Sequence, residues 1–321
     1  MAVKGEGRAF ELVRVPDGER AAWLQIRKQG VGGSDVAAIM GLSHYRSAYS
    51  VWAEKRGLYE PDDISDVPAV HWGNILEPVV GAEYAAAHPD RKIKRVNAVC
   101  RSLSRPWAQA SLDYEVEDPD LGWGVLEIKT AGGRRAGDWE DGVPVYYLTQ
   151  VTHYLSVLDR PFADVAALIG GNDYREYRIM RDPEDEAAVM AAVDDFWQSV
   201  ESGTAPDITG ARDDGRAVFA AHEGEGEVEE AEVSDAMRDY LAAKQAKDEA
   251  EKALTQATNR LKLEIGDRKG FDTDLGRFTW SRGTRKRLDT KRLKEEMPEV
   301  VERFTTITAS DNGIRFTRRK D

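Results

Sequence analysis

The ten residues GWGVLEIKTA, at positions 122–131, decide how this sequence folds and where its chemistry can lie. Residues 125–128 form a short, largely apolar run that glycines precede, which is typical of a buried strand. Alternate residues of a strand share a face, so Glu127 and Lys129 stand side by side, with Ile128 turned the other way. One interpretation is that this face is exposed to water, as in many antiparallel sheets. The other is that the pair belongs to a site.

The composition limits the class of protein. The chain has 321 residues, of which 41% are hydrophobic, enough for one large domain or two. Its one cysteine, Cys100, excludes a disulfide framework and a CxxC metal site within one chain. The first residues, MAVKGEGRAFELVR, include no apolar leader, and no run approaches the length of a membrane span. We therefore expect a cytoplasmic protein without a membrane partner. A P-loop motif is also absent.

The charge is unevenly distributed along the chain. The formal net charge is −13, but residues 271–321 hold 13 Lys or Arg and 9 Asp or Glu, a net of +4. The rest of the chain then carries −17. An acidic body argues against a protein that coats nucleic acid without specificity, whereas basic residues along one groove still allow DNA binding.

Periodicity and turn signals predict an α/β domain over residues 1–205, built around a mixed sheet. A segment rich in Gly, Asp, Glu and Ala, 206–230, is predicted to be a linker. The extension 231–321 is predicted to contain a long polar helix over 233–266, a β-hairpin over 270–283 and a basic helix over 285–304. Within the first domain we expect helices over 17–29, 34–41, 47–57, 69–88, 144–158 and 183–202, a turn over 30–34, and strands over 93–102, 107–116, 123–130, 163–171 and 174–180.

Asp113 is predicted to end a strand, fourteen residues before Glu127. Two antiparallel strands joined by the turn EDPDLGWG would bring the two carboxylates together. With the backbone carbonyl of Ile128 they would form a cage of oxygens of the kind that Mg²⁺ prefers. Lys129 could then orient or deprotonate a water, or neutralise a phosphate.

The pattern of an aspartate, thirteen residues and E-x-K resembles the core of the PD-(D/E)XK nucleases. Five segments in order sharpen the resemblance: WLQIRKQGVGGSDVAAIMGLSHYRSAYSVWAEKRG, WGNILEPVVGAEY, ASLDY, LEIKT and YYLTQVTHYL. Together, over about residues 20–200, they resemble the YqaJ-type viral recombinases, phage exonucleases akin to lambda exonuclease. Leu112 stands where the superfamily's name expects proline, a position that varies widely.

The resemblance implies roles for individual residues. Asp113 and Glu127 match the metal-binding carboxylates, and Lys129 matches the catalytic lysine. Glu77 matches an acidic residue that completes the metal site directly or through water; its alternative is a helix glutamate facing solvent. Gln150 matches a residue that reaches the active site.

Further residues match positions at the DNA. Tyr154 lies one turn after Gln150, where it packs beside the site, and a core role is the other interpretation. Arg27 and Ser34 match residues that hold the 5′-phosphate of the DNA end. Ser34 is also a candidate helix cap, which is compatible with phosphate binding. Arg134 and Arg135 lie on a glycine-rich loop after the catalytic strand, where they either contact phosphates or are solvated.

The function that the resemblance implies is a 5′→3′ exonuclease on double-stranded DNA ends. It would use two Mg²⁺ ions, with Mn²⁺ as a substitute, and leave 3′ single strands for an annealing protein in phage-type recombination. The resemblance also implies a homotrimer, encoded by a phage or prophage in a bacterial host. Two alternatives stay open: an endonuclease or single-strand-specific nuclease of the same fold, and a non-catalytic protein that binds DNA ends.

Overall fold

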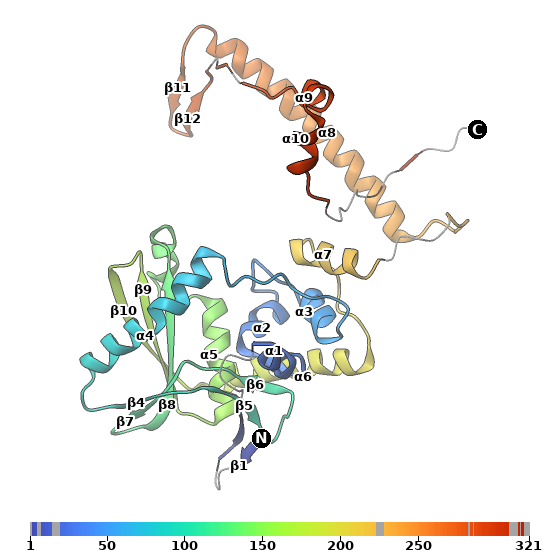
Figure 1. The fold of residues 1–321 in the computed structure, drawn as a ribbon. Helices are drawn as coiled ribbons and strands as arrows, with labels where there is room; N and C mark the ends of the chain where they lie inside the picture. The colour runs from blue at the N-terminus through green and yellow to red at the C-terminus, as the bar shows by residue number, and fades with distance from the viewer. Residues whose placement is uncertain are drawn as a thin grey trace. The chain divides into compact units, whose positions relative to one another are not determined.

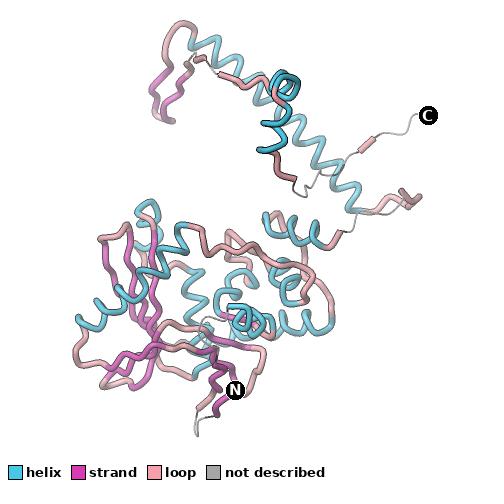
Figure 2. Tube along the Cα trace, in the orientation of Figure 1, coloured by secondary structure: helices cyan, strands magenta, loops and turns pink. Residues whose placement is uncertain are grey.

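The computed structural model divides into two compact units, Met1–Gly224 and Glu225–Asp321, which are described separately. It describes residues 2–4, 8–14, 20–222, 228–281, 283–284, 286–307, 314 and 316–317. Figures 1 and 2 show helices and strands in the first unit, and helices with a hairpin in the second. No helix among these residues is both long and apolar enough to cross a membrane.

The first unit is built on a five-stranded sheet in the order β10-β9-β8-β7-β4. β8 pairs in parallel with β9, whereas the other neighbours are antiparallel, so the predicted mixed sheet is confirmed. β8 lies at the centre of the sheet, where both of its edges are paired. The strands are β4 (Lys92–Arg95), β7 (Tyr114–Asp118), β8 (Gly122–Ala131), β9 (Phe162–Ile169) and β10 (Asp173–Met180).

A second sheet corrects two of the predicted strands. The segments 93–102 and 107–116 were each expected to be one strand, but each is divided between the two sheets. The N–H of Val96 donates to the carbonyl of Asp113 (3.1 Å) at the point where the pair bends from one sheet into the other. The order of this sheet is β1-β2-β5-β6-β3, with β1 (Ala2–Lys4), β2 (Phe10–Arg14), β3 (Val31–Gly32), β5 (Ala98–Ser102) and β6 (Ala108–Ala110).

Two helices cover opposite faces of the central sheet (Figure 1). Helix α4 (Pro68–Ala87) packs on the face of Leu126 and Ile128, and helix α5 (Val145–Leu158) packs on the face of Val125. The α5 face is the one that carries Glu127 and Lys129. Glu127 is only 3% exposed, so the interpretation of this face as a solvated one is wrong.

The start of helix α2 (Gly33–Ile39) differs from the prediction. Its N-cap is Gly32, whose N–H donates to the Asp35 carboxylate (3.1 Å), so Ser34 is a residue of the first turn and not the cap. The predicted turn over 30–34 includes strand β3, because Val31 pairs with β6. The other helices here are α1 (Arg20–Lys28), α3 (Ala48–Lys55) and α6 (Pro183–Ser202), all within segments predicted to be helical.

The segment predicted to be a linker, 206–230, contains a helix, α7 (Arg212–Ala220), which packs against α3. Asp214 of this helix is 1% exposed and accepts hydrogen bonds from the Ser47 hydroxyl and from the N–H of Thr209 (2.7 Å). A buried aspartate with these partners ties the segment to the first unit, which extends to Gly224.

The second unit contains the predicted long helix and hairpin. Helix α8 (Asp235–Ile265) is followed by β11 (Gly270–Thr273) and β12 (Gly276–Thr279). The single basic helix predicted after them is instead two, α9 (Thr290–Glu296) and α10 (Pro298–Arg303). The break follows from the proline, which has no N–H to continue the helical hydrogen bonds.

Candidate active site

Asp113 lies immediately before the first residue of β7, opposite Glu127. The strand register pairs Tyr114 with Leu126, so the residue before Tyr114 faces the residue after Leu126. Asp113 Oδ2 accepts a hydrogen bond from the N–H of Ile128 (2.8 Å). In a strand the N–H and C=O of one residue point to the same side, so the Ile128 carbonyl points past the end of β7 as well. Two carboxylates and a carbonyl therefore gather where β7 begins.

Glu127 is held by the two polar side chains nearest to it. Its Oε1 atom accepts hydrogen bonds from Lys129 Nζ (2.6 Å) and from Gln150 Nε2 (2.8 Å). Lys129 Nζ also donates to Gln150 Oε1 (3.2 Å), which closes a triangle of side chains from β8 and α5. Glu127 Oε2 is buried and has no hydrogen-bond partner among the described residues. A buried carboxylate oxygen without a donor is costly, which marks this atom as a ligand position.

Tyr154 fixes Gln150 from one turn further along α5. Its hydroxyl accepts from Gln150 Nε2 (2.8 Å) and donates to the carbonyl of Ser111 (2.7 Å). At 3% exposure it is a core residue whose polar end reaches the site. The Gln150 amide is thereby oriented toward Glu127, with little freedom to turn.

Glu77, on α4, approaches the cluster from the opposite side. It is half-buried and forms an ion pair with Arg95 of β4 (2.9 Å). Burial raises its pKa, and the nearby Asp113 carboxylate raises it further. Glu77 is therefore near enough to Asp113 to interact with its charge, and it does not face solvent freely.

The charges in the cluster are poorly compensated. Burial raises the pKa of Glu127 to about 7, against the lowering effect of Lys129, and Asp113 and Glu77 add to the increase. Burial also raises the pKa of Asp113. Burial opposes the charged form of Lys129, but Glu127 and Asp113 outweigh it and raise the Lys129 pKa. More negative charge is concentrated here than one lysine neutralises.

The donor atoms fit a hard divalent cation. Only oxygens are offered, by Asp113, Glu127 and the Ile128 carbonyl, and one of them, Glu127 Oε2, is buried with no hydrogen-bond partner in the described part of the chain. As the side chains stand, no three Asp, Glu, His or Cys groups within the described ranges form a metal site by themselves. Glu77 faces Arg95, so it would complete the site through water or after leaving that ion pair.

A second polar group lies beside this cluster. Arg27, at the end of α1, donates to the Ser34 hydroxyl (2.9 Å), and its guanidinium lies 4.7 Å from the Trp23 ring. The first residue of α2, Gly33, lies against α5: a Cβ there would be 2.5 Å from the Tyr154 ring and 2.9 Å from the Gln150 side chain. Because Gly33 has no side chain, Ser34 and Arg27 lie next to the cluster of Glu127, Gln150 and Tyr154.

Asp35 is a site residue that the sequence interpretation missed. It is fully buried and accepts from Lys55 Nζ (2.8 Å), from Arg46 (3.4 Å) and from Arg27 (3.5 Å). Burial favours its neutral form, but the three cations outweigh that effect and hold its pKa well below its usual value. Asp35 thereby fixes Arg27 beside Ser34. The signal was available, because a carboxylate in an apolar helix stretch must be exposed or paired.

The predicted loop with Arg134 and Arg135 is a 3₁₀ helix, η1 (Gly133–Trp139). Arg135 donates to Asp138 (2.8 Å) and to the hydroxyl of Tyr45 (2.9 Å), so its guanidinium already has partners. Arg134 is exposed. Of the two arginines, Arg134 is the one that is open to an approaching phosphate.

Comparisons with known proteins give the following matches. The YqaJ-like viral recombinase domain matches residues 22–161. The uncharacterized protein YqaJ of Bacillus subtilis (strain 168) is 30% identical over 307 residues, which span 92% of this chain and 94% of YqaJ. Protein D345L of African swine fever virus (strain Badajoz 1971 Vero-adapted) is 39% identical over 64 residues, or 20% of this chain and 18% of D345L.

Solved structures also match more than half of the chain. The alkaline exonuclease LHK-Exo of Laribacter hongkongensis is 20% identical, with a TM-score of 0.47, over 57% of this chain and 93% of that one. A phage-related exonuclease of Haemophilus somnus 129PT is 14% identical, with a TM-score of 0.33, over 55% of this chain and 96% of that one.

Proposed function

Because the chain belongs to the YqaJ-like viral recombinase family, we propose that it is a Mg²⁺-dependent 5′→3′ exonuclease on the ends of double-stranded DNA. It would leave 3′ single strands for an annealing protein to use in recombination. The observation that carries the proposal is the buried triangle of Glu127, Lys129 and Gln150 opposite Asp113. Charged groups are this deeply buried only where they are paired or bind a cation.

In the proposed reaction, Asp113, Glu127 and the Ile128 carbonyl would hold Mg²⁺, or Mn²⁺ in its place. When bound, such an ion lowers the pKa of a water and neutralises charge on the phosphate. The Lys129 ammonium, held by Glu127 and Gln150, would donate to the attacking water or to a phosphate oxygen. Because the Lys129 pKa is raised, the charged form that these tasks require is favoured.

The direction of digestion is proposed to come from the group around Arg27. Arg27 and Ser34 would bind the terminal 5′-phosphate, and Asp35 keeps the guanidinium in position beside the hydroxyl. Gly33 packs on Gln150, so a phosphate bound by Arg27 and Ser34 would lie next to the proposed catalytic cluster. A strand held by its 5′ end would then present its first phosphodiester to Lys129. A homotrimeric ring is also proposed, to keep the enzyme on its substrate.

Digestion of linear and closed circular duplexes by the full chain tests this function. With Mg²⁺, linear DNA should be lost while circles stay intact, and Asp113→Ala should abolish the loss. Nicked circles would identify an endonuclease instead, and loss of single strands alone would identify a single-strand-specific nuclease. Binding of ends without any loss would identify a non-catalytic protein.

A further inference from the structure

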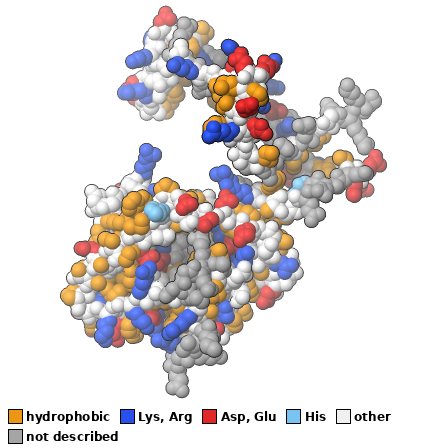
Figure 3. Space-filling model, viewed as in Figure 1, with side chains coloured by type: hydrophobic (Ala, Val, Ile, Leu, Met, Phe, Trp, Pro, Cys, Tyr) orange, Lys and Arg blue, Asp and Glu red, His pale blue; other side chains and the backbone are white. Residues whose placement is uncertain are grey.

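The second unit contains the most basic part of the chain. Residues 260–294 hold 12 Lys or Arg and 5 Asp or Glu, a net of +7 in a chain of −13. Figure 3 shows Lys and Arg side chains on the end of this unit that carries the hairpin. Such a concentration of positive charge is complementary to a polyanion, and its binding would be sensitive to salt.

The hairpin of β11 and β12 gathers aromatic rings on one face. Its register pairs Phe271 with Phe278. The N–H of Trp280 donates to the carbonyl of Lys269 (3.0 Å). The pairing of the two strands therefore extends by one more pair, Lys269 with Trp280. Residues two apart on a strand share a face, so Lys269, Phe271, Phe278 and Trp280 lie on the same side.

This face is only partly covered by its own unit. Ile265, at the end of α8, is buried, yet Phe278 and Trp280 remain 38% and 39% exposed. Cations flank the rings: Lys262 Nζ lies 5.7 Å from the Trp280 ring, and Arg268 lies 5.4 Å from the Phe271 ring. Open aromatic rings bordered by cations are the arrangement on which nucleic-acid bases stack while their phosphates are neutralised.

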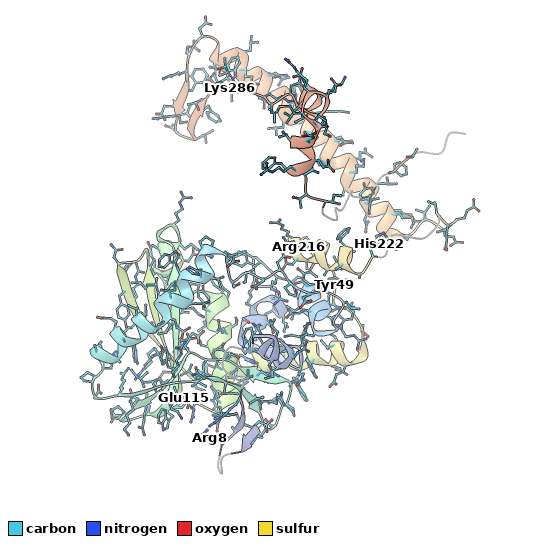
Figure 4. All side chains as sticks on the ribbon, viewed as in Figure 1. Arg8, Tyr49, Glu115, Arg216, His222 and Lys286 are labelled. Carbon is cyan, nitrogen blue, oxygen red and sulfur yellow. The ribbon has the colours of Figure 1, made fainter. Side chains whose placement is uncertain are left out.

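The basic residues continue after the hairpin. Lys286 and Arg287 lie between β12 and α9, where Figure 4 marks Lys286, and both are exposed. Lys291 and Lys294 follow on α9, and neither is buried. A strand whose bases stack on the hairpin would therefore find further positive charge along the same unit.

We propose that the β11–β12 hairpin and the basic segment after it bind single-stranded DNA. The proposal rests on the proposed exonuclease function, whose product is a 3′ single strand. A single strand fits better than a duplex, because aromatic stacking needs base faces that pairing and stacking hide in a duplex. The second unit would thus retain the product while the first unit digests the other strand.

Fluorescence anisotropy with a labelled oligothymidylate tests the proposal. An oligonucleotide of roughly 20 nucleotides is long enough, because single-strand binding sites commonly span ~4–16 nucleotides. The full chain is used in EDTA, so cleavage does not interfere. The double variant Phe278→Ala/Trp280→Ala should bind at least roughly 30-fold more weakly, since stacking contributes ~1–3 kcal/mol per base and two rings are removed. Phe304→Ala removes an equally aromatic side chain of the same unit, 77% exposed, and should leave binding unchanged.

A second pair of variants keeps the test decisive if the alanines unfold the hairpin. Trp280→Phe retains a stacking ring and should retain affinity. Lys286→Glu/Arg287→Glu changes only exposed residues and should weaken binding and flatten its dependence on salt. Wild-type affinity in the aromatic and charge variants, or tighter binding of a matched duplex, would overturn the proposal. Because binding is measured without cleavage, failure of the exonuclease function alone would leave this result unaffected.

Discussion

Glu127→Gln should stabilise the metal-free protein above neutral pH. Burial raises the pKa of Glu127 from 4.5 to about 7. Because the folded state holds this proton more tightly than the unfolded chain does, folding stability is greatest below the unfolded pKa. It falls as the pH rises toward the folded pKa. Glutamine keeps the oxygen that accepts from Lys129 and Gln150 but cannot ionise, so the variant should not show this fall.

The size of the effect follows from the pKa difference. Each pKa unit corresponds to ~1.4 kcal/mol, so ionised Glu127 should cost ~3 kcal/mol. For a unit the size of Met1–Gly224 this equals roughly 6–12 °C in melting temperature. The difference between variant and wild type should vanish at about pH 4, where Glu127 is protonated in both the folded and the unfolded wild type.

Urea unfolding in EDTA, at about pH 8 and about pH 4, measures the difference directly. Addition of Mg²⁺ at the higher pH should then stabilise wild type more than the variant, because the variant lacks one of the two carboxylate ligands. Equal stability of the two proteins at both pH values would refute the argument. A variant less stable than wild type at about pH 8 would show that Glu127 is a structural partner of Lys129 and not a strained metal ligand.

Four further outcomes are expected. Lys129→Ala should lose cleavage but retain Mg²⁺ binding by calorimetry; cleavage at the wild-type rate would remove Lys129 from the mechanism. Arg27→Ala should reduce the preference for 5′-phosphate ends over 5′-hydroxyl ends, measured as the ratio of the two affinities, by about 10- to 100-fold, since a charge-assisted contact contributes ~1.5–3 kcal/mol. An unchanged ratio would show that the phosphate binds elsewhere. Gly33→Ala should destabilise the chain by ~1–3 kcal/mol and impair cleavage, because its Cβ would overlap the Tyr154 ring at 2.5 Å; wild-type thermal melting and activity would contradict this packing. Light scattering should give three times 35.8 kDa, and the mass of one chain at micromolar concentration would exclude the trimer.

The local part of the site was predictable from the sequence. Asp113 and Glu127 are joined by one turn, so strand geometry alone predicts that they meet. Gln150 and Tyr154 share a face because they are four residues apart on one helix. These predictions needed only the periods of strand and helix and the length of a turn.

Features that depend on distant segments were not predictable in this way. The apolar helix stretch around Asp35 indicates a carboxylate that is exposed or paired, but not its partners, because Lys55 and Arg46 come from another helix and the loop before it. Asp214 binds Ser47, which lies 167 residues away, so a helix was missed in a segment whose composition is typical of linkers.

The strands that bend between the two sheets show a further limit. Their apolar pattern continues through the bend at Val96 and Asp113, and only the partner strands divide them. Local periodicity therefore predicts that a strand is present, but not which sheet each half joins.

The most direct test of the central claim is digestion of a linear duplex labelled on one strand, at either its 5′ or its 3′ end, with Mg²⁺. The account predicts early release of label from a phosphorylated 5′ end, late loss of label from the 3′ end, and no release in EDTA or by Asp113→Ala. Early loss of the 3′ label, or release that continues in EDTA, would contradict it.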